Sequence, residues 1–255
     1  MRRRERFIFW SVALGVLLWL IQLVPLEWRY WAIAGFGLAV YFISALALRE
    51  DLQLREWFVI LPLPALYSLT IASFYFLLPS NFWSMIFVIG IFVLGAYSIF
   101  LTSNIFSVAK GRTIQLLNAA QTIALFFAIV ISLLGSQIIF SFNLPFYFNA
   151  LAIFALHLPL VLTIVWSVNL EEKISLKLWQ LSFFSALLMG ELAAVYSFLP
   201  MKTWNIALLL MSIFYLILGI LQSYLREKLF RQAITEYVLL ASFIFIMSVA
   251  FFPGK

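Results

Sequence analysis

The sequence predicts an all-α protein, a polytopic transmembrane helical bundle of about nine spans (8–9). Apolar residues make up 65% of the chain and charged residues only 10%, with a mean hydropathy of +1.10, whereas soluble domains are about half apolar and a quarter charged. The apolar residues gather in runs close to the roughly 20 residues that a bilayer requires. We therefore expect one integral membrane domain over residues 1–255.

Nine apolar runs have the length of a membrane span. They cover residues 7–24, 29–48, 58–78, 82–102, 116–135, 146–168, 178–199, 203–222 and 236–252. The first run follows a basic start but is not followed by a small-residue cleavage site, so it is predicted to be a retained helix. The run over 116–135 is the weakest, because Asn118, Gln121 and Thr122 lie in its first third. If that run is re-entrant, the chain has eight spans.

The basic residues predict the orientation of the bundle. With a cytoplasmic N-terminus, all but three of the 16 lysines and arginines lie on the inner side, as the positive-inside rule requires. Tryptophans are expected at the two interfaces. The predicted outer anchors are Trp28, Trp31, Trp83 and Trp204, and the predicted inner anchors are Trp10, Trp57, Trp166 and Trp179. Trp19 does not fit this pattern.

Two outer turns share the frame Y-x-x-L-P-x-x-x-W, over residues 75–83 and 196–204. They stand four helices apart and have the same predicted orientation. The frame fits a parallel duplication of helices 1–4 and 5–8 followed by a ninth helix. It also fits convergence, because outer turns favour proline and interfacial aromatic residues.

The composition argues against several classes of function. The chain has no cysteine, one histidine and one aspartate, so thiolate chemistry, multi-histidine zinc centres and paired-aspartate magnesium sites are excluded. The H-E-x-x-H, G-x-S-x-G and Walker A patterns do not occur in the sequence. We expect no metal and no cofactor. The net charge of +6 is explained by the inner loops, so nucleic acid is not expected as a partner.

Two ionisable residues lie inside predicted spans and are the candidate substrate or proton sites. Glu191 borders a stripe of small residues, Ser182, Ala186, Gly190 and Ala194, so its side chain is predicted to face protein. His157 stands two residues before Pro159, and simple counting places it at a similar depth to Glu191. An ionisable group in a span indicates function by default. The alternative is a polar contact that only orients two helices.

A second polar group is predicted at the cytoplasmic end of the fifth run. Its members are Lys110, Arg112, Gln115, Asn118 and Thr122. They could bind a lipid headgroup or line a vestibule, although helix ends at this level ordinarily carry such residues. The inner loops over 102–115 and 222–236 mix basic and apolar residues, which predicts short helices on the anionic inner leaflet.

The run L-T-S-N-I-F-S-V-A-K-G-R-T-I-Q-L-L over 101–117, with G-E-L-A-A-V-Y-S-F-L-P over 190–200, resembles a family of uncharacterised polytopic bacterial membrane proteins. The resemblance implies a bacterial inner membrane and no particular reaction. It directs attention to Asn104, Arg112 and Glu191.

The leading hypothesis is a small carrier or channel-like protein for a proton, a cation or a partly apolar solute that engages Glu191. A non-catalytic scaffold that recruits partners through its basic loops is the first alternative. A lipid-handling enzyme that uses Glu191 and His157 as acid and base is the second. The expected partners are the lipid bilayer, anionic headgroups, and a second copy or another membrane protein. The predicted location is a bacterial cytoplasmic membrane.

Overall fold

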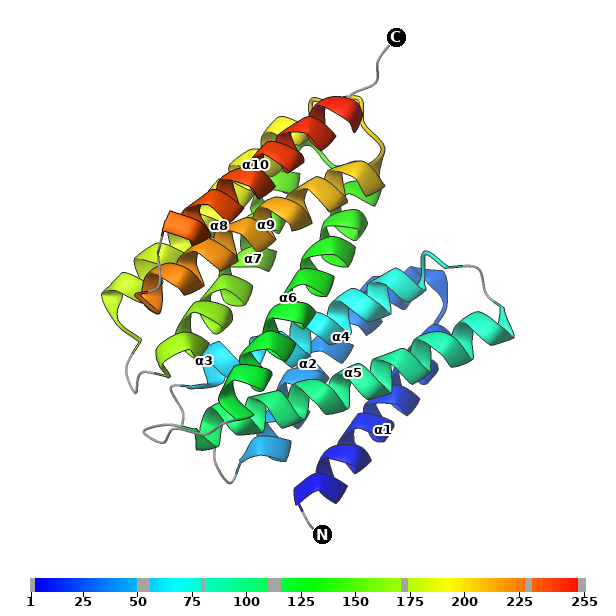
Figure 1. Cartoon of the computed structure of the whole chain (residues 1–255). Coiled ribbons are helices and arrows are strands. Elements are labelled where there is room, and N and C mark those ends of the chain that lie inside the picture. The colour runs from blue at the N-terminus through cyan, green and yellow to red at the C-terminus, as the bar shows by residue number, and fades with distance from the viewer. Residues whose placement is uncertain are drawn as a thin grey trace. The chain divides into compact units, whose positions relative to one another are not determined.

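A computed structural model describes residues 3–49, 56–78, 81–109, 116–170, 174–227 and 231–251, and the regular structure in these ranges is helical throughout (Figure 1). The elements are α1 (Arg3–Gln22), η1 (Leu26–Trp28), α2 (Arg29–Leu48), α3 (Trp57–Ile60), α4 (Pro62–Tyr75), α5 (Phe82–Val108), α6 (Leu116–Ser141), α7 (Phe146–Asn169), α8 (Leu176–Tyr196), α9 (Thr203–Leu225) and α10 (Arg231–Phe251).

Eight helical segments within the described residues are long and apolar enough to cross a membrane, and α3 and α4 together form one of them. The predicted all-helical membrane bundle is therefore confirmed, and the chain is a multi-pass membrane protein. The predicted weak span is α6, which has 26 residues and the highest hydropathy of the eight, 2.5. The shorter apolar segment Thr235–Met247 lies in α10, so the choice between eight and nine spans depends on α10 and not on α6.

The prediction of short interfacial helices in the inner loops is wrong for the residues that the structure describes. Residues 102–108 continue α5, whose last turn is closed by the amide of Ala109 donating to the carbonyl of Ile105 over 2.8 Å. Residues 222–225 belong to α9 and residues 231–236 to α10. Backbone hydrogen bonding carries a helix past the end of its apolar run, so hydropathy alone underestimated these helices.

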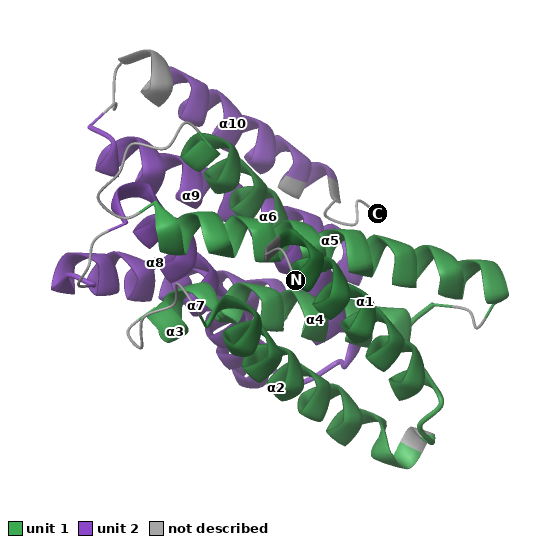
Figure 2. Ribbon diagram, turned by 90° about the horizontal axis from the view of Figure 1, so that it is seen from below, with its two compact units in different colours: residues 1–127 green, residues 128–255 purple. Residues whose placement is uncertain are grey.

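The chain divides into two compact units, residues 1–127 and 128–255, with the boundary inside α6 (Figure 2). The first half of α6 belongs to unit 1 and the second half to unit 2. Each unit contains its own buried core.

The core of unit 1 is built around Tyr67 on α4. Its ring stacks on Phe92 at 5.7 Å and meets Phe127 edge-on at 5.2 Å, and its hydroxyl donates to the carbonyl of Ile91 over 3.2 Å. Gly95 provides the space, because a Cβ at that position would overlap the Tyr67 hydroxyl. The missing side chain on α5 therefore allows a large aromatic residue to fill the space between helices.

In unit 2, α7 packs along α8, and the small-residue stripe makes this approach close. Ser182, Ala186 and Gly190 are buried. An added Cβ on Gly190 would stand 2.9 Å from the carbonyl oxygen of Ala150 and 3.3 Å from Cβ of Phe154. The predicted role of the stripe in helix packing is confirmed for Gly190, because only a residue without a side chain allows the two backbones to come this near.

The last helix, α10, is tied to α9 through one tyrosine. The hydroxyl of Tyr237 donates to the carbonyl of Gly219 over 2.8 Å and lies 2.7 Å from the hydroxyl of Ser223. An added Cβ on Gly219 would stand 2.9 Å from Cε1 of the Tyr237 ring. Gly219 therefore provides both the space and the acceptor that hold α10.

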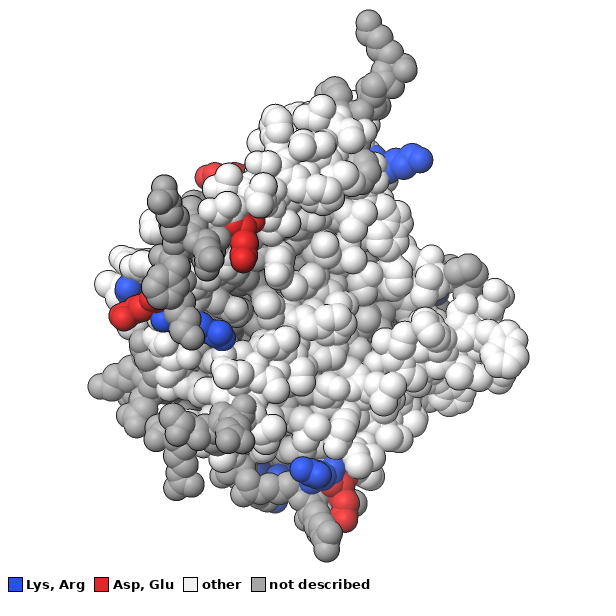
Figure 3. Space-filling model, in the orientation of Figure 1, with Lys and Arg blue, Asp and Glu red and all other residues white. Residues whose placement is uncertain are grey.

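The surface is apolar over broad areas, as a bilayer environment requires. On the face drawn in Figure 3, a wide area carries no lysine, arginine, aspartate or glutamate. Trp28, Trp31 and Trp83 are exposed, as expected of interfacial anchors. Trp166 is only 2% exposed, so it is a core residue of unit 2 and not a lipid-facing anchor, although it stands three residues before the end of α7 at Asn169.

Candidate functional site

His157 is the ionisable residue that the structure buries inside unit 2. It lies on α7 with 0% exposure. Its Nδ1 is 2.8 Å from the carbonyl oxygen of Ile153, one turn earlier, and its Nε2 is 2.8 Å from Oγ of Ser132 on α6. A carbonyl only accepts, so Nδ1 carries the hydrogen and Nε2 of the neutral ring accepts from the serine hydroxyl.

Two neighbours complete the surroundings of the imidazole. Phe214 on α9 meets the ring edge-on, with the ring centroids 4.6 Å apart. Pro159 lies inside α7 and has no amide hydrogen, so it cannot donate to the carbonyl of Ala155. α7 stays one continuous helix from Phe146 to Asn169, and it lacks this single backbone hydrogen bond near His157, which stands two residues before Pro159.

Buried polar side chains continue from His157 toward the turn that joins α6 to α7. Ser136 and Gln137 stand about one turn beyond Ser132 on α6, and Asn149 stands about two turns from His157 on α7. Within the described residues, Oγ of Ser136, Oε1 of Gln137 and Oδ1 of Asn149 are buried and have no hydrogen-bond partner. We call Ser132, Ser136, Gln137, Asn149 and His157 the unit 2 polar set.

The amide group of Asn149 shows that this set reaches the end of the helices. Its Nδ2 donates to the carbonyl of Leu144, in the α6–α7 turn, and to Oγ of Ser197 after α8, each over 3.1 Å. The unit 2 polar set therefore extends from the middle of α7 to that turn, which lies on the outer side in the orientation predicted from the basic residues.

The other half of α7 is different. Thr163 donates to the carbonyl of Pro159 over 2.8 Å and Ser167 to that of Ile164 over 2.7 Å, both within α7 itself. Trp166, which lies between these two residues in the sequence, is buried. Three buried polar atoms without a partner thus lie between His157 and the α6–α7 turn, and a further one, Oγ of Ser182, lies in the first half of α8.

The Ser132–His157 contact has the distance of a serine nucleophile and its base. Both side chains have 0% exposure, so a scissile bond does not reach Oγ in this conformation. The arrangement is therefore suited to holding a proton between buried groups and not to acyl transfer.

Glu191 does not face protein within the chain, and this prediction is wrong. It is exposed on α8, and nine residues, or two and a half turns, separate it from Ser182, so it lies on the opposite side of the helix from the buried stripe. Neighbouring residues on a helix point about 100° apart, so Glu191 does not share a face with its neighbour Gly190. The structure therefore does not bring Glu191 and His157 together.

The depths of these two residues also differ. Gly190 packs on Ala150 and Phe154, which places the neighbouring Glu191 about one turn or more from the level of His157. The prediction of similar depth is wrong because it counted from the ends of apolar runs, and α8 ends at Tyr196, three residues before the predicted end.

The predicted cytoplasmic polar group is described only in part. Lys110, Arg112 and Gln115 lie outside the described residues. Asn118 and Thr122 are exposed on α6, and the Thr122 hydroxyl donates to the backbone carbonyl of Asn118 over 3.0 Å. These two residues match an ordinary polar helix end.

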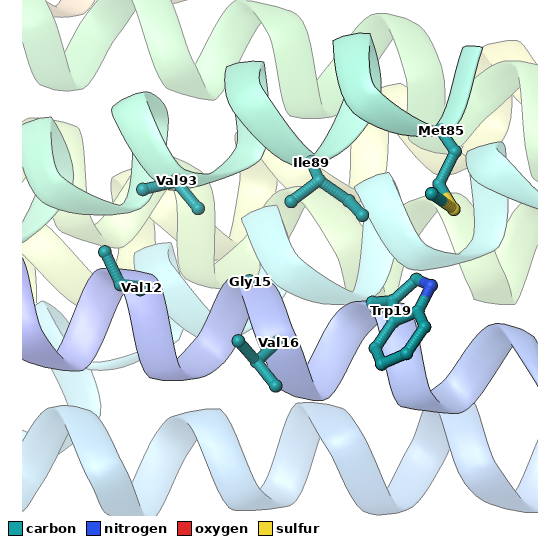
Figure 4. Close-up of a pocket in the computed structure, with 7 residues that line it drawn as sticks. All are labelled: Val12, Gly15, Val16, Trp19, Met85, Ile89 and Val93. Carbon is teal, nitrogen blue, oxygen red and sulfur yellow. The ribbon is translucent and has the colours of Figure 1, made fainter. Parts of the chain in front are cut away.

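An open groove of about 270 Å³ lies between α1 and α5 in unit 1 (Figure 4). It is lined by Val12, Gly15, Val16, Trp19, Met85, Ile89 and Val93. The lining is apolar, so the groove offers no acid, base or metal ligand. Trp19 lies three residues before the end of α1 at Gln22.

Sequence analysis identified His157 but missed Ser132, Ser136, Gln137 and Asn149. A weak signal was present, since Ser132 and Ser136 are four residues apart in an apolar helix and therefore share a face. Which face is buried depends on contacts between helices, which a single sequence does not give. Among the described residues, no group of three or more His, Cys, Asp or Glu could hold a metal ion.

A family model described as "Protein of unknown function (DUF5656)" matches residues 26–251. Neither a curated protein nor a solved structure matches the chain.

Proposed function

We propose that this chain, which belongs to the family of proteins of unknown function DUF5656, is a small carrier that binds a proton at His157. The observation that carries the proposal is the contact of His157 with Ser132 and Ile153, fully buried on a helix that contains Pro159. Ionisable residues inside membrane bundles are rare and mark proton or ion pathways, and Pro159 removes one backbone hydrogen bond from the helix that carries this histidine.

The hydrogen bonding of the site supports both charge states of the imidazole. In the neutral state, Nε2 accepts from the Ser132 hydroxyl. A helical serine can instead donate to the carbonyl one turn earlier, as Ser242 does to Val238 over 2.8 Å. If Ser132 turns in this way, its oxygen can accept a hydrogen from a protonated Nε2. Rotation of one hydroxyl thus accommodates the arriving proton.

The unit 2 polar set supports access from the α6–α7 turn. Ser136, Gln137 and Asn149 hold buried polar atoms without a partner between His157 and that turn, and such atoms favour water or a hydrated proton there. A proton would reach His157 from the outer side and leave to the inner side when α7 changes shape near Pro159. Glu191 lies outside this set, so its part in transport stays a prediction. The lysine and arginine bias supports placement in a bacterial cytoplasmic membrane.

The test is proton flux into liposomes that contain the purified protein and a pH-sensitive dye, with the membrane potential clamped. We expect acidification after an external acid step, and we expect His157→Gln to reduce its rate at least tenfold while the protein remains folded. Ser132→Ala should also slow it. Ser242→Ala is the matched control, because Ser242 is exposed and bonds only its own helix. Flux equal to that of empty liposomes, or unchanged in His157→Gln, would refute the proposal.

A further inference from the structure

Glu191 places a carboxyl group on the outside of unit 2, within a span. It is exposed on α8, and within the described part of the chain no hydrogen bond or ion pair reaches its carboxylate. Five residues separate it from the end of α8 at Tyr196, so its Cα lies about 8 Å inside that end of the helix. An acidic side chain facing hydrocarbon at this depth is unfavourable, which indicates that another surface covers it.

The residues around Glu191 form a regular seam. Leu181, Phe184, Leu188, Glu191 and Val195 follow one another on α8 at steps of three and four residues, the spacing of a helix that packs along a partner helix. Phe184, Leu188 and Val195 are between 44% and 64% exposed. A single polar residue in an otherwise apolar seam fixes the register and the number of helices that associate.

We propose that a second copy of this chain covers the α8 seam, so that the two Glu191 side chains meet across the interface. Copies inserted with the same topology run parallel, and a twofold axis normal to the membrane brings each residue of the seam to its twin at the same depth. Two carboxyl groups in contact can satisfy each other through a hydrogen bond from a protonated oxygen of one to an oxygen of its twin.

The sequence of α8 favours contact between the two Glu191 carboxyl groups over an ion pair between the two copies. Lysine and arginine are absent between Lys177 and Lys202, so a copy of the same helix offers no cation at the level of Glu191. The inference does not depend on proton transport at His157, because it concerns the opposite side of α8 from α7.

Cysteine cross-linking tests this seam cleanly, because the chain contains no cysteine. Val195→Cys and Leu188→Cys, each introduced alone, should give a covalent dimer on oxidation of purified protein in liposomes at low protein-to-lipid ratio, since twins on the axis can reach disulfide distance. Phe245→Cys on α10 is the control, because Phe245 is 70% exposed and lies outside the seam. We expect at least fivefold more dimer from the seam positions.

The role of the carboxyl is tested in the Val195→Cys background. Glu191→Gln retains a side chain that can pair with its twin and should preserve the dimer, whereas Glu191→Leu should reduce it at least fivefold. Thermal unfolding of each variant reports whether it folds. If Glu191→Leu does not fold, the comparison of the seam and control cysteines still tests the proposal. Equal cross-linking at positions 195, 188 and 245 would overturn the proposal. So would dimers in Glu191→Leu equal to those with Glu191, or a cross-link found only in native membranes and joined to a different protein.

Discussion

Gly190 on α8 stands so close to Ala150 on α7 that an added Cβ would lie 2.9 Å from the Ala150 carbonyl oxygen. The obstacle is backbone, which cannot move aside as a flexible side chain can. The closest approach of these two helices in unit 2 therefore depends on a missing methyl group.

Gly190→Ala is accordingly expected to destabilise unit 2 by about 1–3 kcal/mol, the usual cost of forcing an extra carbon into a packed interface. Thermal unfolding in matched lipid nanodiscs measures it. Gly90→Ala on α5 is the control, because nothing lies within 4 Å of an added Cβ there, and loss of a helical glycine should be neutral or stabilising by about 0.5–1 kcal/mol. A Gly190→Ala variant as stable as Gly90→Ala would contradict the described packing.

Gly95 and Tyr67 should be energetically coupled in unit 1. Gly95→Ala pushes against the Tyr67 hydroxyl and ring, so it is expected to destabilise the protein by about 1–3 kcal/mol. In a Tyr67→Phe background the hydroxyl is gone, and the same substitution should cost less. A double-mutant cycle measures the coupling. Strict additivity of the two substitutions would show that the residues do not meet.

Ser132→Ala should also affect stability, apart from any effect on proton flux. The substitution leaves Nε2 of His157 buried without a donor, which costs about 1–3 kcal/mol. Ser242→Ala removes an exposed hydroxyl that bonds its own helix and should change stability by no more than about 0.5 kcal/mol. Chemical denaturation of both variants side by side makes the comparison. Equal effects would mean that the Ser132 hydroxyl does not serve the imidazole.

Tyr237→Phe should loosen α10 without disturbing unit 1. The variant loses the hydrogen bonds to Gly219 and Ser223, and the expected loss is about 0.5–1.5 kcal/mol. Hydrogen exchange followed by mass spectrometry should show that the substitution speeds exchange in α10, relative to the wild type, more than it does in α2. Tyr147→Phe serves as the control, because Tyr147 is 55% exposed on α7. Uniform exchange changes across the chain would argue against a local role.

Much of the fold was predictable because hydropathy reports directly on membrane spans. The run 29–48 coincides with α2, and the run 82–102 was too short only because α5 continues to Val108. The site was less predictable. The apolar run around Glu191 defines a helix but not the side that packs on a neighbour, and two and a half turns separate Glu191 from Ser182. His157 was found because histidine is unusual in such a run, whereas Ser132 and Asn149 are not.

The hydrogen bonds between Tyr237 and α9 also bear on how α10 is inserted into the membrane. The apolar segment of α10, Thr235–Met247, is shorter than the other spans and shorter than the roughly 20 residues a bilayer requires. Because α10 follows α9 in the chain, it is synthesised after α9, and its short apolar segment gives it little tendency of its own to enter lipid. An already inserted α9 offers it the Gly219 carbonyl and the Ser223 hydroxyl. Insertion of α10 is then an assembly step that depends on α9, and a defect in α9 would leave α10 at the membrane surface.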